Sequence, residues 1–482
     1  MREQPPGFRA STDARQYGRD MTTGSIPRHL LLFALPILAG SLLQTAYSFI
    51  DAIWVGRFLG TVALAAITVS FPIVFALIAL GAGLTLATNV LIAQYFGAHR
   101  RGELRKVVDS SLALIGLLSL ILLLIGELLA PRALRAMRTP PEVLPLAVGY
   151  IRVYLLALPF SYGLFLTRSM MQGVGDSRRP LYFQTASVLL NTALDPLLIF
   201  GLLGFPRLGL NGAAWSNVIA QGITLAALLF YLEWKPTLVT PNWRCPNLDS
   251  DTVLTLVRVG LPSAAQQVLV SLGAVIVISI VNRFGPAAVA AYGAGSRIDQ
   301  IAFMPALTYG LAISTVAGQN LGAGAFHRVR LAFRWGVVQS GSLTLMGSVL
   351  AVATPQTLLR IFTTDPEVIA LGTLYLRIVG GLYIFLAVMF IANGIANGAG
   401  HTLVTAGITV MSLWVVRVPL ALFLSRELGS VVGVWYAIGL SFVIGMLLAL
   451  GYYLSGRWQH PIVRRSPLNT SSLLHEDETG DS

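Results

Sequence analysis

Long apolar stretches recur along nearly the whole chain, and each is followed by a short polar segment or by glycine and proline. Every stretch exceeds the about 20 residues that an α-helix needs to cross a membrane. The stretches lack the alternation of period two that is typical of a membrane β-barrel. We therefore predict an all-α polytopic membrane protein with twelve transmembrane helices. These lie at residues 30–55, 62–95, 107–130, 145–170, 181–203, 211–233, 254–282, 287–319, 332–353, 367–394, 402–424 and 431–455.

The composition excludes the other broad classes of protein. Hydrophobic residues make up 55% of the 482 positions and charged residues only 11%, whereas an ordinary soluble domain has about 25% charged residues. A disordered chain is poor in apolar residues and rich in charge, which is the opposite balance. Cys245 is the single cysteine, so the chain can form no internal disulfide and no cysteine-based metal centre.

Basic residues in the predicted loops favour one side of the membrane. If the N-terminus lies inside, the inner loops and tails hold 20 arginines and lysines and the outer loops hold 8. The positive-inside rule then places both termini in the cytoplasm of an inner (plasma) membrane protein, with residues 1–27 as a disordered N-terminal tail and 457–482 as a C-terminal tail that is disordered after Pro461. Because topology explains the net charge of +12, we expect no nucleic-acid partner.

The two halves of the chain resemble each other at a nearly constant offset along the sequence. The matching pairs are LeuPro at 35–36 and 261–262, ArgPhe at 57–58 and 283–284, ProGluVal at 141–143 and 366–368, and Gly173 and Gly398, among others. Each half holds six helices, so both halves enter the membrane from the same side. We therefore divide the chain into a bundle at 28–233, a cytoplasmic linker at 234–253 and a second bundle at 254–456. Two equivalent bundles around a cleft are typical of alternating-access transporters.

Several short motifs resemble those of the MATE (multidrug and toxic compound extrusion) family. They are LeuProIleLeu at 35–38, ValGlyArg at 55–57, GlnGlyValGlyAspSerArgArgPro at 172–180, AspPro at 195–196, GlyAlaAla at 212–214, ArgIleAsp at 297–299 and GlyGlnAsnLeuGlyAla at 318–323. The resemblance implies two six-helix bundles that form a V-shaped central cleft. It also implies a monomer among membrane lipids that exports amphipathic, often cationic, small molecules in exchange for H+ or Na+, with no other cofactor.

Acidic residues inside the predicted helices are the candidates for ion coupling, because a charge in a membrane is costly and usually functional. Asp51 and Asp195 fall in the outer half of the first and fifth helices, so they could approach each other. Asn191 precedes Asp195 by four residues and shares its helix face. Pro196 frees a backbone carbonyl nearby. Asp51 could instead be an interfacial cap and Asp195 a structural polar contact between helices.

The resemblance adds Asn217, which lies where some relatives have a threonine. Members of the family with this arrangement couple ions in the N-terminal bundle, and a sodium ion at Asp51, Asn191 and Asp195 is the alternative to a proton. The repeat supports this asymmetry, because the equivalent positions in the second half are Val277, Trp414 and Val418. The second half therefore lacks the acids of NorM-like relatives, which favours the DinF-like branch.

Other residues are candidates for movement and for substrate binding. Pro36 precedes Asp51 on the same helix and could be a hinge, or it could only fix a static kink. Aromatic and methionine side chains suit lipophilic cations. The candidates for the cleft are Tyr47, Phe160, Tyr162, Met170, Tyr292 and Phe303, although many such residues only pack against neighbours.

Two other functions compete with drug export. A flippase for lipid-linked saccharides or other lipids shares the wider fold group, but its cleft should carry several positive charges for a pyrophosphate. The candidate cleft residues here are acidic and aromatic instead. A membrane enzyme is disfavoured because no acid or histidine cluster has catalytic or metal-binding spacing.

Overall fold

The computed structural model of the chain describes residues 18–137, 139–242 and 247–463. Its described part consists of helices and connecting loops, without β-strands. Ten of these helices are long and apolar enough to cross a membrane, and two bent helix pairs raise the number of spans to twelve. Each predicted stretch coincides with one of them, so the prediction of an all-helical polytopic protein is confirmed.

The helices of the N-terminal half are α2 (Ile26–Phe58), α3 (Gly60–Gly97), α4 (Arg101–Ala136), α5 (Leu144–Leu156), α6 (Leu158–Gly173), α7 (Arg178–Phe200) and α8 (Leu210–Trp234). Those of the C-terminal half are α9 (Ser250–Val281), α10 (Pro286–Gly322), α11 (Phe326–Ala353), α12 (Pro355–Arg360), α13 (Pro366–Gly380), α14 (Tyr383–Gly398), α15 (Thr402–Val410), α16 (Val418–Glu427) and α17 (Val432–Leu454).

Three spans are not the single α-helices that hydropathy predicts. The fourth bends by 44° between α5 and α6, and the tenth by 44° between α13 and α14. Pro159 lies in the first turn of α6, and because it has no backbone N–H it cannot continue the hydrogen-bond pattern of α5. Gly380 and Gly381 weaken the helix at the second break. The eleventh span contains a π-helical segment at Met411–Arg417. A hydropathy profile does not detect these breaks, because it reports only the length of an apolar stretch.

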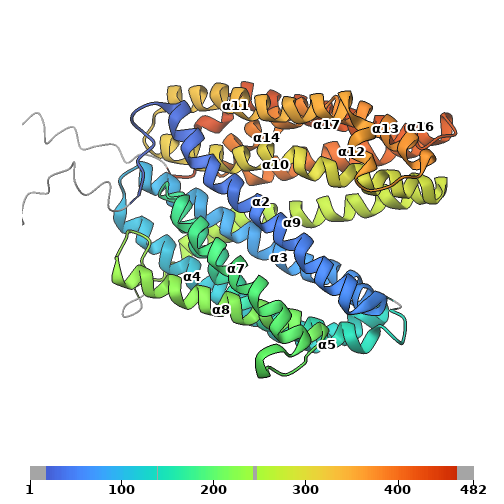
Figure 1. Cartoon of the computed structure of the whole chain (residues 1–482). Helices are drawn as coiled ribbons and strands as arrows, with labels where there is room; N and C mark the ends of the chain where they lie inside the picture. The colour runs from blue at the N-terminus through green and yellow to red at the C-terminus, as the bar shows by residue number, and fades with distance from the viewer. Residues whose placement is uncertain (1–17, 138, 243–246, 464–482) are drawn as a thin grey trace, which may run out of the picture.

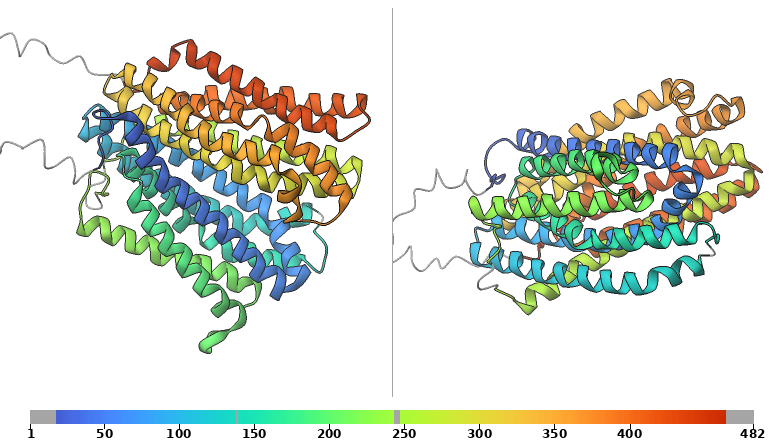
Figure 2. Two further views of the ribbon diagram at one scale, coloured as in Figure 1. Left: turned by 45° about the horizontal axis from the view of Figure 1, so that its top comes forward. Right: turned by 60° about the horizontal axis from the view of Figure 1, so that its bottom comes forward.

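Both described chain ends lie at one end of the molecule, which we term the terminal end (Figures 1 and 2). From there the helices of the two halves run in roughly the same direction and diverge toward the opposite, distal end. Helix α2 crosses obliquely from one half to the other (Figure 1). The divergence gives the V shape expected from the resemblance.

The first helix of each half packs on both halves. Near the terminal end, residues of α2 from Ile26 to Ile37 are buried against α10, α11 and α14, whereas Trp54 packs within the N-terminal half. Helix α9 does the reverse, because Leu256 lies in the core of the N-terminal half and Val277 in that of the C-terminal half. The predicted boundaries between bundles therefore do not separate two independent cores.

Each of these two helices contains a proline near the point where its packing changes from the core of one half to the core of the other half. Pro36 is inside α2 and Pro262 inside α9, at equivalent positions of the repeat. Both are half-buried. A proline inside a helix removes one backbone hydrogen bond, so both helices are weakened at the changeover.

The segment between α8 and α9 docks on α4 where it is described. The buried Asp109 side chain accepts the backbone N–H of Asn247 at 2.9 Å and that of Asn242 at 3.3 Å. Asp249 caps α9 by accepting hydrogen bonds from the Thr252 side chain and backbone, which lower the pKa of Asp249. The predicted linker at 234–253 is thus attached at both sides of residues 243–246, and Cys245 lies outside the described residues.

The described parts of the predicted tails are packed, so the prediction of disorder is wrong for the described residues of 1–27 and for those just after Pro461. Met21 is fully buried and Val463 is only 3% exposed, and Trp458, earlier in the C-terminal tail, is 2% exposed. Apolar residues in short polar segments escape a search for long apolar stretches. The remaining residues of both tails lie outside the described part of the chain.

Candidate functional site

The predicted carboxylate site lies in the N-terminal half, between α2, α7 and α8. Asp195 of α7 is fully buried, and its Oδ1 accepts a hydrogen bond from the hydroxyl of Ser216 of α8. Asn191, one turn earlier on α7, is 4% exposed. Asp51 of α2 interacts electrostatically with Asp195. The three residues therefore lie on two helices, α2 and α7, that contact each other, as the sequence predicted.

Small residues allow α7 and α8 to approach closely beside Asp195. A Cβ atom added to Gly212 of α8 would overlap the backbone of Leu198 of α7. This contact sets Ser216, one turn after Gly212, against Asp195. Ser216 is absent from the residues predicted above, and the GlyAlaAla motif at 212–214 was the only sequence signal for the contact.

Three buried oxygens of this site have no hydrogen-bond donor within the described chain. They are Asp51 Oδ1, Asn191 Oδ1 and Asp195 Oδ2. Neither carboxylate belongs to an ion pair among the described residues. A buried acceptor without a donor costs about 1–3 kcal/mol, and a charged one costs more. A proton or a cation would satisfy these oxygens, and oxygen ligands suit a hard cation.

Asn217 and Tyr47 border the carboxylates. Asn217 Nδ2 lies 3.4 Å from the Tyr47 hydroxyl, and Asn217 Oδ1 accepts from Gln221 Nε2 at 3.2 Å. Tyr47 interacts electrostatically with Asp51 and Asp195. Tyr47 does not line the central cavity described below, and its hydroxyl is the polar neighbour of Asn217 on the carboxylate side.

The C-terminal half holds a buried acid of a different kind. Both oxygens of Asp299 accept hydrogen bonds, one from the hydroxyl of Tyr375 and one from that of Tyr383. Arg417, a half-buried cation of the same half, donates from Nε to Ser441 Oγ at 2.8 Å. Because fixed protein donors already satisfy Asp299, the described part of this half offers no carboxylate comparable to Asp51 and Asp195.

A central cavity of about 390 Å³ lies between the two halves. Side chains of α3, α6, α9, α10 and α14 line it, and the polar ones include Asn89, Arg168, Ser263, Ser314 and Asn393. The cavity is separate from the carboxylate site, since none of Asp51, Asn191 and Asp195 lines it.

The predicted cleft residues do not line this cavity. Tyr162 and Met170 are only 1% exposed and belong to the core of the N-terminal half, so the prediction is wrong for these two side chains. Tyr292 stacks on Trp435, Phe303 packs against Tyr383 and Phe442, and Phe160 is also absent from the lining. When every face of a helix is apolar, the sequence does not show how the helix is rotated about its axis. It therefore does not show which side chains face the core and which face the cavity.

Two glutamines close the cavity on its terminal side. Gln94 Nε2 of α3 donates to the carbonyl oxygen of Gly398 at 2.7 Å, and Gln319 Nε2 of α10 donates to that of Gly173 at 3.0 Å. The two donors occupy equivalent positions of the repeat, and so do the two acceptors. Each half therefore donates one buried hydrogen bond to the other half, and the two bonds are equivalent in the repeat.

The described chain ends are bound to the same two side chains. The backbone N–H of Met21 donates to Gln319 Oε1 at 3.0 Å, and that of Val463 donates to Gln94 Oε1 at 2.9 Å. Gly97 and Gly322 permit this crossing, because a Cβ atom on either would overlap the backbone of the opposite glutamine. We term these residues the glutamine closure.

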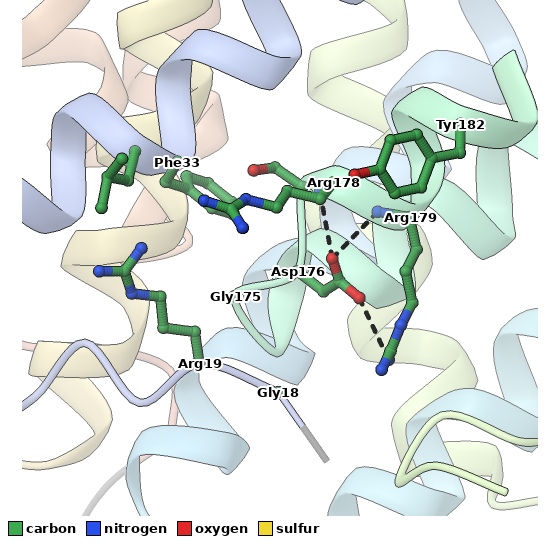
Figure 3. Close-up of a pocket in the computed structure, with 10 residues that line it drawn as sticks. Gly18, Arg19, Phe33, Gly175, Asp176, Arg178, Arg179 and Tyr182 are labelled. Carbon is green, nitrogen blue, oxygen red and sulfur yellow. Dashed lines mark hydrogen bonds and ion pairs between the residues drawn. The ribbon is translucent and has the colours of Figure 1, made fainter. Parts of the chain in front are cut away.

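A basic pocket of about 520 Å³ lies on the terminal end beside the closure (Figure 3). Asp176 accepts the backbone N–H groups of Arg178 and Arg179 and pairs with the Arg179 guanidinium at 3.2 Å. Burial and the neighbouring Arg178 lower the pKa of Arg19, which faces the same pocket. The pocket lies where the segment at Gly18 is held to the loop after α6. Such a basic lining is what the positive-inside rule expects of a cytoplasmic face.

Comparisons with known proteins give a consistent result. The sequence model of the MatE family matches the chain twice, at residues 36–197 and 262–423, once in each half. The probable multidrug resistance protein YpnP of Bacillus subtilis is 32% identical over 440 residues, which cover 91% of this chain and 97% of YpnP. A FAD transporter of Shewanella oneidensis is 26% identical over 92% of this chain and 97% of its own length.

The fold also matches solved structures. A MOP superfamily transporter from Pyrococcus furiosus superposes with a TM-score of 0.84 at 22% identity, covering 91% of this chain and 97% of that one. The duplicated match to the family model agrees with the internal repeat found in the sequence. The favoured DinF-like branch stays a prediction.

Proposed function

The chain belongs to the MATE family of multi-pass membrane transporters, which are not enzymes, and from this premise we propose that it exports amphipathic small molecules in exchange for protons or sodium ions. The name of YpnP supports drugs and toxic compounds as the cargo. The observation that carries the ion coupling is the set of three unpaired buried oxygens on Asp51, Asn191 and Asp195. The cationic cargo implied by the resemblance stays a prediction.

The proposed mechanism is alternating access. The glutamine closure seals the central cavity at the terminal end, which the positive-inside rule places in the cytoplasm. Loading a proton or Na+ at the carboxylate site cancels one of its two negative charges in an apolar environment, so the surrounding helices can pack more tightly. A bound ion shifts the conformational equilibrium only by its different affinity for the two states. Because α2 carries Asp51 and also packs on the C-terminal half, it links ion loading to movement between the halves.

We expect the ion dependence of transport to reside in the N-terminal half. In proteoliposomes with H+ and Na+ gradients imposed separately, the wild-type chain should export its substrate with one of the two. Asp51→Asn should remove the response to that gradient, because an amide cannot load a proton and binds a cation weakly. Gln266→Ala and Gln267→Ala can change affinity for the substrate, since both side chains line the cavity, but should keep the ion response.

Loss of the ion response in either glutamine variant, with the response intact in Asp51→Asn, would place the coupling in the other half. Absence of a response to both gradients in the wild-type chain would contradict the proposed antiport itself.

We also expect Pro36 to act as a hinge of α2. Pro36→Ala should slow transport several-fold while substrate binding persists, because alanine restores the backbone hydrogen bond at the changeover between cores. The measurement is initial transport rate beside equilibrium binding. Pro72→Ala is the matched control, since Pro72 lies within α3 and is exposed. Equal transport rates for Pro36→Ala and the wild-type chain would show that the proline only fixes a kink.

A further inference from the structure

The central cavity carries a positive charge where the resemblance implies a site for cations. Arg168 of α6 lines it, and the described lining contains no aspartate or glutamate. Arg168 forms no ion pair within the described chain, and its one polar contact is a long one of 3.5 Å to Gln184 Oε1. A guanidinium has five N–H donors, so a single weak acceptor leaves most of them without a partner.

An unpaired arginine within a membrane protein is costly, and such residues usually mark the path of a substrate. The repeat shows that this charge belongs to one half only, because the position equivalent to Arg168 in the second half is Asn393. Asn393 lines the same cavity. A structural role common to both halves would not explain why the charge is present once.

Three further side chains in the cavity wall lack partners. Ser263 Oγ of α9, Ser314 Oγ of α10 and Asn393 Oδ1 of α14 make no hydrogen bond in the described chain, and these residues are 4%, 1% and 7% exposed. Buried polar groups in folded proteins are nearly always hydrogen-bonded. Two hydroxyls can donate and an amide oxygen can accept, so the unused groups suit a ligand with both an anionic group and a donor.

The remaining wall is mainly apolar, although polar side chains such as Asn89, Gln266 and Gln267 also line it. Phe165, Leu307, Leu311 and Phe390 face the same space, and the volume of about 390 Å³ falls within the range of small-molecule sites. From this juxtaposition we propose that the cavity binds an amphipathic organic anion. Its carboxylate or phosphate pairs with Arg168, its N–H or O–H reaches Asn393, and its apolar body packs on the two phenylalanines. This inference rests on the proposed export function and names the class of its substrate.

Equilibrium binding tests it with fluorescein and rhodamine 123, which share a xanthene core but carry opposite charge. The full chain in nanodiscs, without any ion gradient, should bind fluorescein at least about tenfold more tightly than rhodamine 123, which corresponds to about 1.4 kcal/mol. Arg168→Gln should remove this preference, and Arg168→Lys should retain part of it. Arg152→Gln is the matched control, because Arg152 is half exposed and pairs with Glu127 away from the cavity.

Tighter binding of rhodamine 123 to the wild-type chain would overturn the inference, as would unchanged fluorescein affinity in Arg168→Gln. If Arg168→Gln does not fold, the double variant Ser263→Ala and Ser314→Ala decides, because it should weaken fluorescein binding several-fold. Ion-driven export of rhodamine 123 without fluorescein binding would refute the anion site and support the proposed export. Fluorescein binding that depends on Arg168, without any ion-driven transport, would support the site and refute the antiport.

Discussion

Replacing Asp195 by asparagine is expected to reduce ion-driven export to the level of vesicles without protein, while the chain still folds and inserts. Asparagine has nearly the same size and can still accept the hydrogen bond from Ser216. It cannot take up a proton, and it removes the negative charge that attracts a cation. Because an ion shifts the transport cycle only through its different affinity for two states, removal of the charge removes the driving force.

The measurement is substrate export in proteoliposomes under an imposed ion gradient, with insertion checked by recovery of the variant in the membrane fraction and folding by size-exclusion chromatography of the purified variant. Asp251→Asn is the matched control, since Asp251 is an exposed acid in the first turn of α9 and should leave transport unchanged. Wild-type export by a correctly inserted Asp195→Asn protein would show that this carboxylate is a structural contact.

An equally large loss of transport is expected from a single methyl group at the glutamine closure. Gly97→Ala and Gly322→Ala each place a Cβ atom against the backbone of the opposite glutamine, where no space exists. Backbone atoms in a packed core cannot yield as a flexible side chain can, so the two halves would no longer meet at the terminal end. The repeat predicts that the two variants behave alike.

Access to the cavity can be measured with Ser314→Cys in a Cys245→Ser background and a membrane-impermeant maleimide applied from the terminal side. Gly97→Ala and Gly322→Ala should raise the labelling rate and abolish export. Gly116→Ala is the control, because no atom lies within 4 Å of a Cβ atom at this position of α4. Unchanged labelling and transport in both closure variants would show that the seal lies elsewhere.

The sequence alone predicted the positions of twelve spans, the repeat and the three polar residues of the carboxylate site. Each follows from a strong physical constraint. The hydrocarbon core requires long apolar helices, and it makes the few acids within them conspicuous. Asp51, Asn191 and Asp195 stood out because they interrupt apolar stretches, and in the structure they lie on the neighbouring helices α2 and α7, each with a buried oxygen that has no donor in the described chain. The constant offset between the halves likewise needs no structure, and the family model matches both halves at the same offset.

Only the tertiary structure decided which faces of these helices meet. Tyr162 and Met170 are core residues, whereas Arg168, on the same helix α6, faces the cavity. Ser216 reaches Asp195 through the small residue Gly212, and Gln94 reaches across the molecule to Gly398. Hydropathy is nearly uniform around a membrane helix, so it carries no information on rotation. Helix rotation is set by close packing of small residues and by buried hydrogen bonds, which join positions far apart in the chain.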